Sequence, residues 1–399
     1  MCARPFARIV DNNDNNNVSR DDIHKHNSIS IARRLPCQAH GYSKHDVFFV
    51  DTVLSAVDGA ALAWFAYAIG QVAIAMLESS NLNTAMTPSL PRTAFEGNVV
   101  WITGASSGIG KEIAMYLAAR GAKLILSARN KEALEKVAEE CRLLHPKTEA
   151  KVLVLDLSEK ATLTSKAEEA LKTYGQPVDV LVNNGGVSTR AMAHETTIEM
   201  DEFLMQVDFL SHVAITKLIV PHMKDNPNAR IINTGSIASI IGVPVHTAYC
   251  AAKHALVGFM EALRIEFFLR GETNIHILNV VLGSTNTDLR RRAVVNASSP
   301  PSSSTSNVVK TFGEGDPNIA KGLDSKFVAE RILSVSYHKS VDQCWLAKGK
   351  EMAILFLNQY LPQTAYTLLS RAATKQYAVQ KMTVKEQDPA KGDVDKKVN

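Results

Sequence analysis

Residues 99–110 read VVWITGASSGIG, a β-branched run that passes directly into a glycine-rich turn. Gly104, Gly108 and Gly110 permit a tight turn and a close approach of the backbone to a ligand, and a helical pattern begins near Ile109. A phosphate group is stabilised at the N-terminus of a helix, where backbone N–H groups lack partners. Because the turn stands between a strand and a helix, the stretch indicates a nucleotide-binding site rather than a purely structural turn.

Short β-branched runs alternate with helical patterns from residue 98 onward. These runs are apolar on both faces, which is typical of strands in a parallel sheet that helices cover on both sides. We expect strands at 99–103, 123–128, 151–156, 178–183, 230–235 and 274–282, and helices at 109–120, 131–144 and 247–269. The expected fold class is therefore α/β, a Rossmann-like doubly wound parallel sheet in a single catalytic domain with an N-terminal extension.

The composition argues against several classes of protein. A chain of 399 residues could hold two or three domains, but the motifs fit one catalytic domain. The 44 Lys and Arg against 40 Asp and Glu give a net charge of +4, too near neutral to favour a nucleic-acid partner. Five scattered cysteines without a C-x-x-C pair predict neither a disulfide framework nor a metal site.

The chain falls into five parts by composition. We expect a polar, disordered tail at 1–46, an apolar membrane-associated helix within 47–78, the catalytic domain at 97–350 with a flexible insertion at 296–307, an apolar docking segment at 351–380 and a charged tail at 381–399. Residues 59–77 carry no charge over nineteen positions, long enough to span a bilayer. Their many alanines leave open a helix on the membrane surface or an ordinary soluble helix.

Basic residues precede this apolar stretch. Seven Lys and Arg lie before it, so the positive-inside tendency would keep the N-terminus cytoplasmic and the catalytic domain on the far side. Asn296, in an Asn-Ala-Ser sequon, would carry a glycan if that domain lies in a lumen.

The end of the second expected strand bears on the choice of nucleotide. A site for NAD would place an acidic residue there, on the ribose 2′-hydroxyl. The chain has Arg129 instead, whose planar cation suits the 2′-phosphate of NADP(H), and Lys111 follows the glycine loop. NADP(H) is therefore expected, with NAD(H) the alternative if Arg129 is only a solvated surface residue.

A possible set of catalytic side chains follows the fifth expected strand. Tyr249 and Lys253 lie one helical turn apart and so share a face, and Ser236 closes the strand before them. Reduction of a carbonyl needs an acid, and tyrosine can serve if a nearby ammonium lowers its pKa from about 10 to about 7, which takes roughly 4 kcal/mol. A Tyr-x-x-x-Lys pair alone is more often a plain helix surface, so the pair depends on its context.

The order and spacing of all these motifs resemble the short-chain dehydrogenase/reductase (SDR) family over roughly residues 97–350. The motifs are TGASSGIG at 103–110, Asp156, NNGG at 183–186, Ser236, YCAAK at 249–253 and LGSTNT at 282–287. Within the family, the chain is most similar to the membrane-anchored dehydrogenase/reductase member 7 group. That group resemblance rests on the segment around NNGG with Ser188 and Arg190, the segment around YCAAK, and NQYLPQTA near the C-terminus.

The resemblance implies roles for individual residues. The cofactor would be bound by Gly104, Ser106, Ser107, Gly108, Ile109, Gly110, Arg129, Asp156, Asn183, Tyr249, Lys253 and Thr287. Tyr249 is implied as the general acid or base, Lys253 as its partner on the nicotinamide ribose, and Ser236 as the group that holds the substrate oxygen. The implied substrates are hydrophobic carbonyls or alcohols of steroid or retinoid type. The implied setting is a homodimer on a membrane, the endoplasmic reticulum.

The chain departs from the family pattern at three positions. Asp208 stands where the resemblance expects the asparagine of a proton relay, Gly185 replaces alanine, and Leu282 replaces a proline. The charge of Asp208 would favour a protonated Lys253, so we expect reduced or pH-shifted turnover. The alternative function is a nucleotide-binding SDR scaffold with little turnover that acts through partners.

Overall fold

The computed structural model describes residues 59–70, 73, 80–287 and 322–387. The tail expected at 1–46, the insertion expected at 296–307, the sequon at Asn296 and most of the charged C-terminal tail lie outside these described residues. The chain divides into two compact units, residues 1–63 and 64–399, and the second contains all the strands named below.

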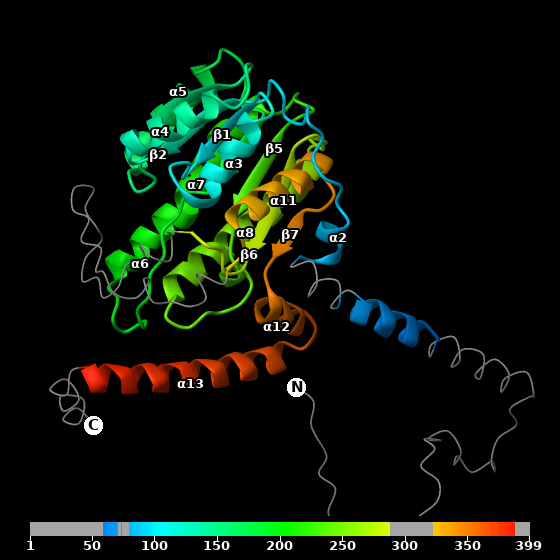
Figure 1. Cartoon of the computed structure of the whole chain (residues 1–399), viewed down its shortest axis with the longest axis vertical. Helices are drawn as coiled ribbons and strands as arrows, with labels where there is room; N and C mark the ends of the chain where they lie inside the picture. The colour runs from blue at the N-terminus through cyan, green and yellow to red at the C-terminus, as the bar shows by residue number, and fades with distance from the viewer. Residues whose placement is uncertain (1–58, 71–72, 74–79, 288–321, 388–399) are drawn as a thin grey trace, which may run out of the picture. The chain divides into compact units, whose positions relative to one another are not determined.

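Seven parallel strands form one sheet within the described residues, in the order β3-β2-β1-β4-β5-β6-β7 (Figure 1). The strands are β1 (Val99–Thr103), β2 (Lys123–Ala128), β3 (Glu149–Val154), β4 (Val180–Asn183), β5 (Arg230–Thr234), β6 (His276–Leu282) and β7 (Gln343–Leu346). The strand order reverses direction between β1 and β4, which confirms the predicted doubly wound α/β class.

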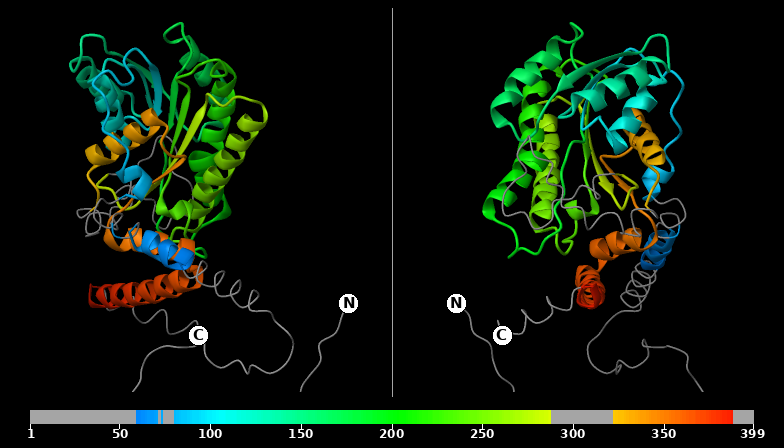
Figure 2. Two further views of the ribbon diagram at one scale, coloured as in Figure 1. Left: turned by 90° about the vertical axis from the view of Figure 1, so that its right-hand side faces the viewer. Right: turned by 60° about the vertical axis from the view of Figure 1, so that its left-hand side comes forward.

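The side chains of β1 point alternately to the two faces of the sheet, and each face is covered by its own layer of helices. All five residues of β1 are buried. Val100 and Ile102 belong to the core shared with α3 (Gly108–Ala118), α4 (Lys131–Arg142) and α11 (Ser325–His338). Val99 and Trp101 belong to the core shared with α5 (Leu163–Lys172), α7 (Ser211–Ile219) and α8 (Thr247–Leu269). Successive side chains of a strand point to opposite faces, so the sheet lies between both layers (Figure 2).

Shorter elements complete the domain built on this sheet. They are α2 (Leu82–Ala85), η1 (Lys160–Thr162), α6 (Ile198–Met205), η2 (Gln206–Leu210), η3 (Val220–His222) and η4 (Ile237–Ser239). Helix α3 begins one residue before the start expected at 109. Strand β3 begins two residues before the start expected at 151, and β4 begins two residues after the start expected at 178. Helix α8 has the predicted bounds.

The C-terminal segment forms two helices rather than one. Helix α12 (Gly349–Tyr360) ends before Pro362, which begins α13 (Pro362–Gln387). Proline lacks an N–H group, which costs nothing in the first turn of a helix but breaks a helix interior. Helix α13 runs past residue 380, where a charged tail was expected to begin.

One continuous helical stretch among the described residues is long and apolar enough to cross a membrane. It is Ile198–His222, which comprises α6, η2, α7 and η3. Half of its most apolar window is buried, as in the core helix of a folded domain. Of the stretch expected at 59–77, residues 59–70 are described as a helix, with exposed side chains at Leu62, Trp64 and Phe65.

Candidate active site

A cleft of about 390 Å³ lies at the carboxyl ends of the strands. Its walls are the segments that follow the first six strands, β1 to β6, together with one residue of η2, the start of α8 and one residue of α12. The cleft thus lies beside β1 and β4, where the strand order reverses, which is the usual ligand position in an open parallel sheet.

The glycine loop after β1 packs too closely for side chains. Gly104 has a φ of +67°, and a Cβ there would lie 2.7 Å from the Cα of Gly185. A Cβ on Gly110 would overlap the carbonyl oxygen of Gly104. Ser107 is the N-cap of α3, so the unpaired N–H groups of this helix start at the cleft. The loop therefore has the backbone geometry that the sequence predicted for a phosphate site.

The predicted cofactor residues mostly converge on this cleft. Those that line it are Gly104, Ser106, Ser107, Gly108, Ile109, Arg129, Asp156, Tyr249, Lys253 and Thr287, whereas Gly110 does not. Ser236, predicted to hold the substrate oxygen, lines the same cleft. No hydrogen bond or ion pair to Arg129 is found in the described part of the chain, so its guanidinium is available to a ligand. Lys111 instead pairs with Glu140 at 2.7 Å, which makes it a weaker candidate for a phosphate.

Asn183 does not reach the cleft. Its side chain is fully buried inside the sheet and donates from Nδ2 to Oδ1 of Asn233 at 2.9 Å and to Oγ1 of Thr216 at 3.0 Å. The next residue, Asn184, lines the cleft and donates from Nδ2 to the carbonyl oxygen of Thr103 at 3.1 Å. The structure therefore places Asn184, not Asn183, at the cleft.

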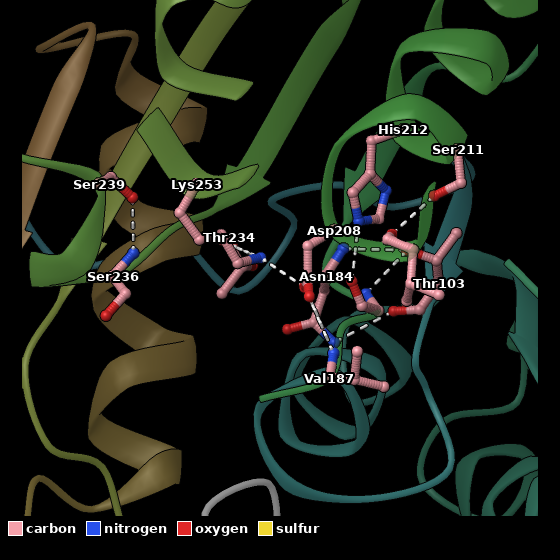
Figure 3. Close-up of polar contacts among 12 residues, drawn as sticks. Thr103, Asn184, Val187, Asp208, Ser211, His212, Thr234, Ser236, Ser239 and Lys253 are labelled. Carbon is pink, nitrogen blue, oxygen red and sulfur yellow. Dashed lines mark hydrogen bonds and ion pairs between the residues drawn. The ribbon is translucent and has the colours of Figure 1, made fainter. Parts of the chain in front are cut away.

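Ser236, Tyr249 and Lys253 lie together on the far wall of the cleft. Ser236 caps η4 after β5, and its Oγ accepts from the N–H of Ala238 at 3.2 Å. Tyr249 and Lys253 lie in the first turns of α8, with 8% and 4% of their surface exposed. The Nζ of Lys253 lies 5.7 Å from the centre of the Tyr249 ring. It also donates to the Thr234 carbonyl oxygen at 3.4 Å (Figure 3).

The pKa of Tyr249 differs from the expectation. Burial raises this pKa above its usual value, and neither the charge of Lys253 nor a hydrogen bond from Ser236, which both lower it, offsets the effect. Asp208 raises the pKa of Tyr249 further. Lys253 thus lowers the pKa of Tyr249, as predicted, but the phenol of Tyr249 in the cofactor-free protein stays a weaker acid than that of free tyrosine.

Asp208 forms an ion pair with Lys253 inside the protein. It lies in the π-helical turn η2, is fully buried, and its Oδ1 is 3.2 Å from Nζ of Lys253 (Figure 3). The N–H of Val187 donates to both carboxylate oxygens, at 3.3 and 3.4 Å. Burial raises the pKa of Asp208 to about 6, although Lys253 opposes the rise. Burial disfavours the charge of Lys253, but Asp208 and Tyr249 together outweigh this, so the pKa of Lys253 is raised.

Two residues that the sequence reasoning missed adjoin the site. His212 is fully buried one turn after Asp208, and burial lowers the pKa of its imidazole to about 3. A neutral His212 donates from Nε2 to the Gly185 carbonyl oxygen at 2.8 Å and so holds the loop after β4. Its spacing of four residues from Asp208 was the available signal. Glu351 of α12 also lines the cleft, and no spacing pattern pointed to it.

The lining of the cleft has the kinds of groups that bind a dinucleotide. One part of the cleft has the N-terminus of α3 and the closely packed glycines, and Arg129 supplies a cation at the end of β2. Another part has the cluster of Ser236, Tyr249 and Lys253. These residues suit a pyrophosphate, a ribose phosphate and a reacting carbonyl, respectively. The fold and the cleft together are those of a dinucleotide-binding oxidoreductase, and a tyrosine and a lysine line the cleft.

The chain belongs to the short-chain dehydrogenase family, because the family model described as short chain dehydrogenase matches residues 98–297. This confirms the resemblance drawn from the motifs. A solved structure, an alcohol dehydrogenase from the archaeon Thermococcus sibiricus complexed with 5-hydroxy-NADP, shares the fold. It has a TM-score of 0.52 and 24% sequence identity, over 63% of this chain and 97% of that one.

Relatives in the family point to one group. Human dehydrogenase/reductase SDR family member 7 is 32% identical over 69% of this chain and 78% of its own length. An Anopheles gambiae protein named SDR family protein 7-like is 32% identical over 70% of this chain and 84% of its own length. The chain is thus an SDR of the member 7 group, as its motifs predicted, and these relatives support an oxidoreductase.

Proposed function

We propose that the protein is an NADP(H)-dependent oxidoreductase that interconverts a carbonyl and an alcohol on a hydrophobic substrate. The observation that carries this proposal is the convergence of Ser236, Tyr249 and Lys253 on the cleft that holds the glycine loop. The tyrosine that would be the acid, the lysine cation and the glycine loop that would bind phosphate thus line one cavity at the carboxyl edge of the sheet. A carbonyl carbon and a nicotinamide would meet between them.

Each residue would have one task. NADPH, when bound, supplies the hydride for reduction. Ser236 holds the substrate oxygen by a hydrogen bond, and Tyr249 donates its proton to the oxygen as negative charge develops. Lys253 stabilises the tyrosinate that remains and binds the nicotinamide ribose. Asp208 keeps Lys253 protonated through the reaction, since it raises the pKa of that ammonium.

Arg129 supports NADP(H) over NAD(H). Its guanidinium lines the cleft at the end of β2, and no acidic side chain stands at that position to receive a 2′-hydroxyl. The Thermococcus sibiricus structure that shares the fold was determined with an NADP analogue. NAD(H) remains the alternative, and a titration with each cofactor distinguishes the two.

The setting we propose is the membrane of the endoplasmic reticulum, with steroid or retinoid substrates. The apolar stretch at 59–77 and the exposed Tyr360, Leu361 and Tyr366 of the C-terminal helices support contact with lipid. We also propose a homodimer. It is supported by Phe268 and other exposed apolar side chains at the end of α8.

NADPH oxidation with a panel of steroid and retinoid carbonyls tests the function. We expect turnover by the native protein and a loss of about 10²-fold or more in Tyr249→Phe, because the proton donor is removed. Glu202→Gln, an exposed position on α6, serves as the control variant. Equal rates in native protein and Tyr249→Phe would refute the tyrosine mechanism.

A scaffold with little turnover is the second candidate. The raised pKa of Tyr249 and the buried charge of Asp208 favour it, because both oppose loss of the tyrosine proton. The scaffold predicts tight NADPH binding with no oxidation of NADPH by any carbonyl of the panel. Binding with turnover excludes the scaffold, and absence of NADPH binding refutes both candidates.

A further inference from the structure

We infer that Glu351 is a positioning residue that holds the loop after β6 against the cofactor cleft. The inference rests on the proposed function, because the loop at Gly283–Thr287 is a wall of the cleft where a nicotinamide would lie. Glu351 comes from the first turn of α12, 67 residues after Ser284. One side chain thereby ties the C-terminal helix to the wall of the site.

The contact uses both carboxylate oxygens. The backbone N–H of Ser284 donates to Oε2 of Glu351 at 2.8 Å, and the hydroxyl of Ser284 donates to Oε1 at 2.5 Å. Hydrogen bonds to a carboxylate are about twice as strong as bonds between neutral groups. A two-point contact also fixes orientation, so the backbone at Ser284 is held in one place.

The neighbouring glycine makes room for this carboxylate. A Cβ on Gly283 would overlap Oε2 of Glu351 and would lie 2.8 Å from Cβ of Ala347. Leu282, just before it, is the last residue of β6 and pairs with Leu346 of β7. Glu351 therefore contacts the loop where it leaves β6, and it supplies this contact from outside the loop.

Helix α12 packs against strands and a loop that border the cleft. Its buried side chains Met352, Leu355 and Phe356 pack on Val281 of β6 and Trp345 of β7. Ile237 and Ile240, which border η4 next to Ser236, pack on the same cluster. The helix thus contacts the β6 loop through a carboxylate and the Ser236 loop through apolar side chains. A shift of α12 would move both walls of the cleft together.

Hydrogen exchange in the cofactor-free protein tests the contact directly. The variants are Glu351→Ala, which removes both acceptors, and Glu351→Gln, which keeps one, with Gln359→Ala on the exposed face of α12 as control. We expect the Ser284 amide to exchange about 10-fold faster in Glu351→Ala, with a smaller change in Glu351→Gln, because a charge-assisted bond is lost. Unchanged exchange at Ser284 in both variants would overturn the inference.

Cofactor affinity tests whether the contact positions the site. We expect the Kd of NADPH to rise about 10-fold in Glu351→Ala and less in Glu351→Gln, because the first variant removes both acceptors and the second keeps one. Faster exchange with unchanged NADPH affinity would also overturn the inference. If Glu351→Ala does not fold, Glu351→Gln decides in the same way.

The two proposals fail differently. A native protein that binds neither NADPH nor NADH refutes the proposed function and, with it, the positioning role. A native protein that binds NADPH, with variants equal to it in both measurements, refutes the role of Glu351 alone.

Discussion

The buried ion pair of Asp208 and Lys253 makes the sharpest prediction, because Asp208→Asn removes its negative charge with little change of shape. The two charged atoms lie 3.2 Å apart. At an effective dielectric constant of about 20 their attraction is about 5 kcal/mol, and breaking a buried pair typically costs 3 to 5 kcal/mol. At 1.36 kcal/mol for each pKa unit, the pKa of Lys253 should fall by about 2 to 4 in the variant.

The pH profile of reduction should change at both ends. Asp208 has its pKa raised to about 6, so the native protein should show an inflection near pH 6 that Asp208→Asn lacks. Asp208 also raises the pKa of Tyr249, and the variant removes this effect. Tyr249 must be protonated to act as the acid, so the alkaline decline in rate should begin at lower pH in Asp208→Asn.

The assay is the rate of NADPH oxidation from about pH 5 to about pH 10, with one carbonyl substrate and both kcat and kcat/KM measured. Glu202→Gln, on the exposed side of the preceding helix, should leave the profile unchanged. Superimposable profiles for native protein and Asp208→Asn would refute the claim that this carboxylate sets the protonation of the site.

Three further predictions concern binding and stability. Arg129→Ala should raise the Kd of NADPH about 10- to 100-fold in a fluorescence titration while changing that of NADH little, and equal changes for both would contradict a role at the 2′-phosphate. Gly110→Ala should abolish NADPH binding, because its Cβ would overlap the Gly104 carbonyl oxygen, and native affinity in a titration would disprove the close packing. Arg230→Met should lower the free energy of unfolding by about 2 to 4 kcal/mol in urea, because three backbone carbonyl oxygens lose their donor, and a change below about 0.5 kcal/mol would refute this.

The strands and the reacting side chains could be predicted because their signals are local. Buried parallel strands read as continuous apolar runs, so β1 and β2 were placed with the right bounds. Tyr249 and Lys253 share a helix, and a spacing of four puts them on one face whatever the rest of the fold. Signals of this kind survive without knowledge of tertiary contacts.

The choice between two consecutive asparagines could not be made in this way. Asn183 ends β4 with its side chain inside the sheet, and Asn184 begins the loop with its side chain at the cleft. Side chains alternate along a strand, so the outcome depends on the residue at which the strand ends. Sequence patterns locate such ends to within a few residues only, and one residue reverses the result.

The burial of Asp208 against Lys253 also depends on one local irregularity, here the π-helical turn η2, which changes the direction in which the following side chains point. The hydrogen bonds of η2 (Gln206–Leu210) close wider turns than those of α6 and α7, on either side of it. A face extrapolated from α6 at 3.6 residues for each turn is therefore rotated by the time it reaches α7. The wider turn orients Asp208 toward Val187 and Lys253, so the ion pair on which the proton chemistry depends is a property of this irregular turn. A variant that restored a regular α-helix here should separate Asp208 from Lys253 even with both residues present, and should reproduce the pH profile of Asp208→Asn.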